Sequence, residues 1–298
     1  MDKVIAIVGP TAIGKTKISI EIAKRLGLEI ISGDSVAVYK GLDIGSAKPT
    51  KEEMQGVKHH LIDVLEPTEQ YDVSMFQAEA RKIIYKNHKA IICGVTGLYI
   101  QSAIYDYRFD AKKRDQTFEE QFIGYSNEEL YNYLLSIDAN IDTSKLHQNN
   151  RKRVLRAIEI YNDTTKSVSA QNALSRPLFD SYVIYLNVSN RDVLYNRINQ
   201  RVDNMIRLGL IDEVKNLYDR GIYPHAIGYK ELVPYFEGNI SLDSAIEEIK
   251  KNSRHLAKRQ MTWFKNQMKS HFYEVNLNDI DETIDKIYKD LKEFLGGE

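Results

Sequence analysis

The first hundred residues alternate between short apolar runs and amphipathic stretches. Val4–Val8 is a continuous apolar run, which is typical of a buried strand. Apolar residues then recur at helical spacing over 18–26, and Gly27 predicts the end of that helix. A second short strand is expected over Leu28–Ile31. A strand, a loop, a helix and another strand in this order predict a parallel α/β sheet.

Two further apolar runs extend this predicted sheet. We expect a third strand at His60–Val64 and a fourth at Ala90–Cys93. Between them, Ser74 followed three residues later by Gln77 predicts a capping box that begins a helix ending near His88.

The pattern changes in the middle of the chain. Tyr107–Asp142 is polar and aromatic and shows no strong strand signal. Ser126 with Glu129 predicts a capped helix, and Arg151–Tyr161 predicts a second, amphipathic one. The strand pattern returns at Tyr182–Val188 and predicts that the chain rejoins the sheet there.

The remaining third of the chain is predicted to be mostly helical. Helices are expected at 191–208, 210–219, 243–268 and 280–295, with an edge strand at Phe272–Val275. The expected fold class is therefore α/β. Residues 1–111 and 181–298 would form a parallel-sheet core, and 112–180 would form a mostly helical insertion domain.

Composition narrows the class of protein. The chain has 298 residues, of which 43% are hydrophobic, so it can bury a full core without metal or disulfide support. Its single cysteine, Cys93, excludes an intrachain disulfide. No apolar run approaches the roughly 20 residues of a membrane span, and the first residues resemble no secretory signal. We expect a soluble, cytoplasmic monomer with no membrane partner.

The strongest motif follows the first predicted strand. Residues 9–16 read Gly-Pro-Thr-Ala-Ile-Gly-Lys-Thr and fit the phosphate-loop pattern G-x-x-x-x-G-K-[ST] between a strand and a helix. The glycines let backbone N–H groups turn toward phosphate oxygens, and the helix start adds positive potential. Lys15 would supply charge to the terminal phosphates and Thr16 a hydroxyl for Mg²⁺. The motif predicts a P-loop core that binds a polyphosphate, without specifying a nucleotide.

Polar residues follow two other predicted strands at the same sheet edge, where ligands of parallel sheets bind. Asp34 could be a general base, a group near Mg²⁺ or a helix cap. Thr96 could bind substrate or simply form a turn between glycines. No acidic residue ends the strand at Ala90–Cys93, which disfavours an ATP-hydrolysing motor.

Basic residues are concentrated in two segments although the chain's net charge is only −1. No acidic residue occurs between Glu248 and Glu274, a stretch that includes Lys258, Arg259 and Trp263. The second segment is 151–156. Either could be an ordinary solvated face. Together, however, they favour a polyanionic partner, and interleaved aromatics are typical of single-strand or loop recognition in RNA.

Several blocks, in the same order along the chain, resemble the tRNA dimethylallyltransferases, also called tRNA isopentenyltransferases. The blocks are Gly9–Thr16, Gly33–Pro49, His59–Val64, Gly94–Tyr99, Arg153–Glu159, Ile227–Glu231 and Lys258–Phe264. The chain departs from the family pattern at Ala37, Ser46 and Val95, where Gln, Thr and Gly are usual.

This resemblance implies the chemistry of the site. Dimethylallyl diphosphate would donate its prenyl group to N6 of adenosine 37, next to the anticodon, in tRNAs that read codons starting with U. The products would be N6-(dimethylallyl)adenosine and diphosphate. Asp34 would be the general base, and Lys15 and Arg201 would act on the leaving group, with Mg²⁺ as the cofactor on Thr16. The diphosphate would contact Gly9, Pro10, Thr11, Ala12, Ile13, Gly14, Lys15 and Thr16.

The tRNA would be the macromolecular partner, held at its anticodon stem-loop. The positions matching the family's tRNA contacts, together with two residues of the basic segment, are Asp34, Ser35, Val36, Ala37, Thr96, Lys152, Arg153, Val154, Leu155, Arg156, Lys258 and Arg259. Two other functions remain open from the residues alone. A small-molecule P-loop kinase would explain the phosphate loop and Asp34, and a non-catalytic RNA-binding protein would explain the basic segments.

Overall fold

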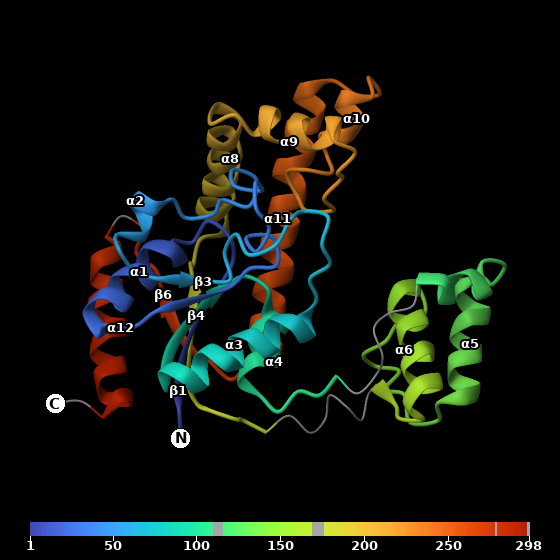
Figure 1. The fold of residues 1–298 in the computed structure, drawn as a ribbon, viewed down its shortest axis with the longest axis horizontal. Coiled ribbons are helices and arrows are strands. Elements are labelled where there is room, and N and C mark those ends of the chain that lie inside the picture. The colour runs from blue at the N-terminus through green and yellow to red at the C-terminus, as the bar shows by residue number, and fades with distance from the viewer. Residues whose placement is uncertain (110–115, 169–175, 278, 297–298) are drawn as a thin grey trace. The chain divides into compact units, whose positions relative to one another are not determined.

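The computed structural model describes residues 1–109, 116–168, 176–277 and 279–296 (Figure 1). The chain forms two compact units, one of Met1–Ile104 with Phe179–Glu298 and the other of Tyr105–Leu178. The sequence-based boundary between 111 and 112 lies outside the described residues. No helix among the described residues has the length and apolar character that crossing a membrane requires.

A six-stranded sheet forms the centre of the first unit. All its neighbouring strands pair in parallel, in the order β3-β2-β4-β1-β5-β6. The strands are β1 Lys3–Val8, β2 Ile30–Gly33, β3 His59–His60, β4 Lys89–Gly94, β5 Asp180–Asn187 and β6 His271–Glu274. This confirms the α/β class and the return of the chain to the sheet after the inserted segment. Because β1 lies between β4 and β5, the loop after it stands at the middle of the sheet.

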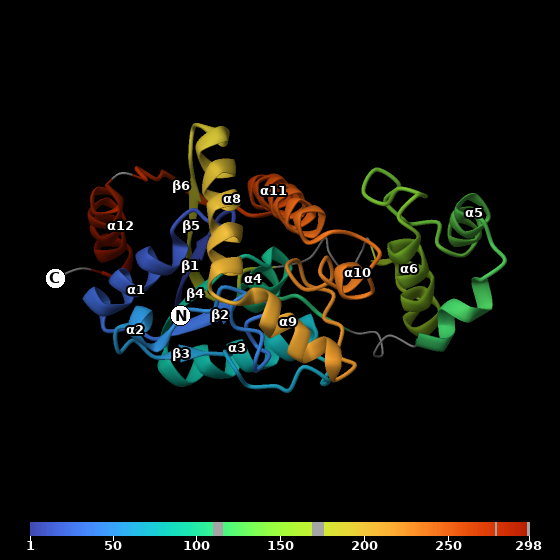
Figure 2. The same ribbon diagram turned by 90° about the horizontal axis from the view of Figure 1, so that it is seen from above.

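Helices cover both faces of this sheet, with α1 and α12 on one side and α3 and α4 on the other (Figures 1 and 2). The helices of this unit are α1 Lys15–Leu26, α2 Lys51–Met54, α3 Val73–Asn87, α4 Gly97–Ile104, α8 Arg191–Arg207, α9 Leu210–Asp219, α10 Val233–Phe236, α11 Leu242–Gln267 and α12 Ile280–Leu295.

Successive side chains of a strand point to opposite faces of the sheet, so every second residue of β1 packs against the same helices. Ile5 and Ile7 of β1 are buried in the core that α1 and α12 form, together with Ile18 and Ile287. Gly27, in the left-handed conformation, ends α1 as its sequence predicts. The phosphate loop therefore joins β1, which is buried from Val4 to Val8, to a helix that packs on one face of that strand.

The predicted start of α3 is wrong by two residues. Asp72 is the N-cap, and its Oδ1 accepts hydrogen bonds from the backbone N–H groups of Ser74 at 2.8 Å and Met75 at 3.0 Å. Gln77 does not close a capping box, because its side-chain amide donates to the carbonyl of Ser102 at 2.9 Å.

The predicted strand at His60–Val64 is wrong for most of its length. Only His59–His60 pairs with β2. Leu61 and Asp63 have φ of +61° and +55°, in the left-handed region, which turns the chain away from the sheet. The second strand likewise begins at Ile30 and not at Leu28.

The second unit contains η1 Gln116–Phe122, α5 Asn127–Ile137 and α6 Arg151–Thr164. The capping box of Ser126 and Glu129 at the start of α5 is confirmed. Leu130 and Leu134 of α5 are buried with Val154 of α6 in a small apolar core of this unit's own.

Candidate active site

A cavity of about 930 Å³ lies within the first unit. Segments far apart in the sequence line it: the phosphate loop, the turn after β2, the loop before α2, the turn after β4, and the helices α8 and α11. Three of these segments follow the carboxyl ends of β1, β2 and β4, which is the edge where ligands bind in parallel sheets.

Two glycines let the phosphate loop adopt its shape. Gly14 has a φ of +98° and is the N-cap of α1. A Cβ on Gly9 would lie 2.6 Å from the carbonyl oxygen of Leu186 in β5, which is closer than a side chain tolerates. Glycine is therefore required at Gly14 by backbone conformation and at Gly9 by the neighbouring strand.

Two side chains from distant helices hold the same loop, and the sequence motifs identify neither of them. Arg197 of α8 donates from Nε to the carbonyl of Ala12 at 3.1 Å. Gln260 of α11 accepts the backbone N–H of Thr11 at 3.0 Å, and its side chain is buried. Gln260 lies inside the family-like block Lys258–Phe264, and its place in that block is the one feature of the sequence that could have indicated a role at the site.

Lys15 is buried beneath the loop and is 8% exposed. Its Nζ donates to the carbonyls of Gly9 at 3.0 Å and Pro10 at 2.6 Å. Burial lowers the pKa of Lys15 to about 8; nearby Cys93 opposes that shift and Arg201 adds to it. Both of these hydrogen bonds go to neutral carbonyl groups. A phosphate oxygen, which is anionic, would form a stronger hydrogen bond with the ammonium.

Asp34 and Arg201 line this cavity with Lys15. Asp34 Oδ1 accepts from the backbone N–H groups of Val36 at 2.8 Å and Ala37 at 3.4 Å. Burial lowers the pKa of the Arg201 guanidinium, and the charge of Asp34 opposes that shift. Asp34 therefore caps a local turn with one oxygen, while its charge acts on the cavity's cations.

Thr96 connects the turns after β2 and β4. Its Oγ1 lies 3.5 Å from Ser35 Oγ, and its backbone N–H donates to Gly33 at 3.2 Å. These contacts place Thr96 beside the Asp34 turn at the cavity wall.

The basic segment on α11 borders the cavity. Lys258 and Arg259 are exposed, and Arg259 lines the cavity together with Trp263. The Trp263 ring packs against the backbone of Gly97, where an added Cβ would lie 2.2 Å from Cε3. Charge and an aromatic ring therefore adjoin the phosphate loop.

The basic segment on α6 is only partly available to a partner. Lys152 and Arg153 are exposed, but Val154 and Leu155 are buried in the core of the second unit. Arg156 pairs with Glu159 at 2.6 Å. The tRNA contact expected at Val154 and Leu155 stays a prediction, and because both side chains are buried, it would have to be made through the backbone.

The oxygen donors around the phosphate loop fit a Mg²⁺ ion that takes few ligands from the protein and most of its ligands from the substrate phosphates and water. Among the described residues, no cluster of three or more His, Cys, Asp or Glu side chains could form a metal site. Thr16 and Asp34, both hard oxygen donors, line the same cavity. Mg²⁺ commonly takes one or two such protein ligands and completes its shell with phosphate oxygens and water.

Comparisons with known proteins agree with this geometry. A model of the IPP transferase family matches residues 37–267. A tRNA dimethylallyltransferase of Geobacillus thermodenitrificans is 47% identical over 92% of this chain and 91% of its own length.

Solved structures resemble the chain over nearly its full length. A tRNA delta(2)-isopentenylpyrophosphate transferase of Staphylococcus epidermidis is 42% identical, with a TM-score of 0.72, covering 98% of this chain and 99% of its own. A eukaryotic dimethylallyltransferase acting on tRNA is 27% identical, with a TM-score of 0.85, covering 100% of this chain and 81% of its own. These likenesses do not favour a small-molecule kinase.

Proposed function

This protein belongs to the IPP transferase family, and we propose that it transfers a dimethylallyl group from dimethylallyl diphosphate to N6 of adenosine 37 in tRNA. The proposal rests on the observation that the phosphate loop, Asp34 and Arg201 line the same cavity. A diphosphate bound on the loop would place its dimethylallyl group beside Asp34. Of these three elements, only Asp34 can accept a proton.

The phosphate loop would stabilise the leaving diphosphate. Breaking the bond between the allylic carbon and the diphosphate oxygen leaves cation character on carbon and negative charge on the diphosphate. Lys15, the loop's N–H groups and Arg201 would meet that negative charge, and such preorganised electrostatics commonly contributes more to catalysis than any other effect. Mg²⁺ on Thr16, when bound, would add further charge neutralisation.

Asp34 would act on the nucleophile. The adenine amino group is a poor nucleophile because its lone pair is delocalised into the ring, and it must lose a proton once the new carbon–nitrogen bond has formed. Asp34 accepts its two backbone bonds through Oδ1, so the carboxylate retains the capacity to take that proton. General-base catalysis is worth about 10²- to 10⁴-fold in rate.

The target base would leave its stack to reach the cavity, at a cost of a few kcal/mol. Phosphate contacts from Arg259, which lines the cavity, and from the neighbouring exposed Lys258 would offset part of that cost. Lys152 and Arg153 offer a second exposed pair of cations on the other unit. An enzyme acting on tRNA would work in the cytoplasm, and we propose that it does so as a monomer.

The test is incubation with an anticodon stem-loop RNA, Mg²⁺ and dimethylallyl diphosphate, followed by mass spectrometry of the nucleosides. We expect a prenylated adenosine at position 37 and free diphosphate. A parallel reaction with ATP and candidate metabolites tests the kinase alternative. Phosphoryl transfer without prenylated adenosine would refute the proposal.

A further inference from the structure

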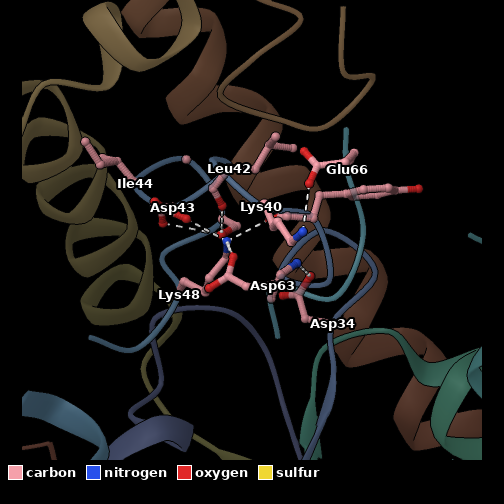
Figure 3. Close-up of polar contacts among 12 residues, drawn as sticks. Asp34, Lys40, Leu42, Asp43, Ile44, Lys48, Asp63 and Glu66 are labelled. Carbon is pink, nitrogen blue, oxygen red and sulfur yellow. Dashed lines mark hydrogen bonds and ion pairs between the residues drawn. The ribbon is translucent and has the colours of Figure 1, made fainter. Parts of the chain in front are cut away.

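Lys48 is a buried lysine outside the phosphate loop. Its side chain is only 5% exposed. Its Nζ lies 2.6 Å from Asp43 Oδ1 and 2.5 Å from Asp63 Oδ1, and donates to the carbonyl of Tyr39 at 2.8 Å (Figure 3). An ammonium has three donor hydrogens, so these three contacts use all of them. Although Lys48 lies at the cavity wall, it has no donor left for a substrate phosphate.

Asp63 is tied to the turn after β2 through its backbone as well. It has a φ of +55°, and its N–H donates to the carbonyl of Ala37 at 3.2 Å. The next N–H, of Val64, donates to Val38 at 2.9 Å. Aspartate is one of the few residues besides glycine that adopt the left-handed conformation, and the contact of its carboxylate with Lys48 adds a tertiary anchor at this turn.

The turn that Asp63 holds is the one that orients Asp34. The N–H of Ala37 bonds Asp34 Oδ1, while the carbonyl of the same residue accepts from Asp63. Contacts therefore run continuously from Lys48 through Asp63 and Ala37 to the Asp34 carboxylate.

Removing Lys48 would release this arrangement without unfolding the protein. The side chains of Asp43 and Asp63 are 61% and 49% exposed, so both carboxylates can take up water once the ammonium is gone. Left without a cation, they would repel each other across the loop. The loss would fall on the conformation of the turn and not on the core.

We propose that Lys48 is a positioning residue for Asp34, acting through Asp63 and the Ala37 peptide. The proposal deepens the proposed function, because it rests on Asp34 accepting the proton of the adenine amino group. Lys48 itself touches no reacting atom.

The first test is Lys48→Met with Lys40→Met as the matched control. Lys40 lies on the same segment and forms an exposed ion pair with Glu66 at 2.7 Å; the charge of Asp63 is the smallest of the influences that raise the pKa of Lys40. With saturating substrates, Lys48→Met should slow prenyl transfer about 10-fold or more, a partial loss of the roughly 10²- to 10⁴-fold that a general base contributes. The KM for dimethylallyl diphosphate should stay within twofold, because the phosphate loop is untouched. Lys40→Met should leave both unchanged.

A double-mutant cycle separates positioning from general damage. Once Asp34→Asn has removed the base, Lys48→Met should slow the reaction little further, since residues that act as a unit are not additive. If the double variant instead loses rate by the product of the two single-variant losses, the two residues act independently and the proposal is overturned. A raised KM with an unchanged kcat would do the same, because it would assign Lys48 to substrate binding.

Hydrogen exchange tests the positioning without any turnover. In the free protein, amides of residues 36–38 should exchange faster in Lys48→Met than in Lys40→Met, while urea unfolding shows that both variants are folded. Equal exchange rates would overturn the inference. If the two variants differ in exchange as expected but the natural protein forms no prenylated product, the proposed function fails and the positioning of Asp34 stands.

Discussion

The side-chain oxygen of Gln260 accepts the backbone N–H of Thr11 at 3.0 Å, across 249 positions of sequence. Gln260 is buried one residue after Arg259, on the helix proposed to contact tRNA phosphates. One helix thus connects the proposed tRNA surface with the phosphate loop.

Gln260→Leu should weaken binding of the prenyl donor. The substitution leaves the Thr11 N–H without its acceptor, and a lost buried hydrogen bond costs about 1–3 kcal/mol. We expect KM for dimethylallyl diphosphate to rise about 5- to 100-fold, measured by steady-state kinetics. Thr262→Ala, an exposed change on the same helix, should leave KM unchanged. An unaltered KM in Gln260→Leu would show that the loop holds its shape without this contact.

Asp34→Asn should abolish prenyl transfer while tRNA still binds. Asparagine keeps an oxygen that can accept the Val36 N–H, so the turn is retained, but it cannot take a proton at neutral pH. Single-turnover rates should fall about 10²- to 10⁴-fold, with the Kd for tRNA within a few-fold of the natural protein's in filter binding. Near-normal turnover would exclude Asp34 as the general base.

Lys15→Met should stabilise the free protein most at neutral pH. Burial lowers the pKa of Lys15 from its ordinary 10.5 to about 8, which corresponds to about 3 kcal/mol of cost for keeping the charged group in the fold. Between these two values the unfolded chain binds more protons, so stability of the natural protein rises with pH there. Below pH 8 both states are protonated and the cost is present in full.

The advantage of Lys15→Met should therefore shrink as the pH rises above 8. Urea unfolding of both proteins at pH 7 and pH 9.5 measures it. Asp285→Asn, on the surface of α12, controls for general effects of pH and should show no such change in this interval. A pH-independent difference between Lys15→Met and the natural protein would contradict the lowered pKa.

Lys258→Ala with Arg259→Ala should weaken tRNA binding and reduce its salt dependence. Both side chains are exposed, and Arg259 lines the cavity. Each lost phosphate contact should lower the slope of log K against log salt by about 0.7–0.9. The matched control is Lys289→Ala with Lys292→Ala on α12, which removes the same charge away from the cavity. If both pairs change the slope equally, α11 has no special role in tRNA binding.

Gly97→Ala should displace Trp263. The added Cβ would lie 2.2 Å from Cε3 of the ring, so one of the two must move. Overpacking of this kind costs about 1–3 kcal/mol. Because Trp263 is the only tryptophan, its fluorescence should shift directly. Gly124→Ala, where nothing lies within 4 Å, should change neither fluorescence nor stability.

Local patterns predict most of the elements that pack against the sheet. The apolar run of β1, the left-handed Gly27 and the Ser126 capping box all act within a few residues, so the sequence alone reveals them. The helix α4 is not predicted, because its residues are apolar on nearly every side and show no helical period. The cap of α3 is predicted two residues too late, because Asp72 and Ser74 are both residue types that cap helices and only packing engages the Gln77 side chain elsewhere.

The sequence by itself determined that a phosphate loop joins a buried strand to a helix, since spacing and glycine chemistry are local properties. It also indicated that Asp34 and Thr96 follow strands that end at one sheet edge. Only the tertiary structure decided that Gln260 and Arg197 hold that loop and that Lys48 is shared by two carboxylates. These contacts join residues brought close by the packing of helices and loops, and no local periodicity encodes them.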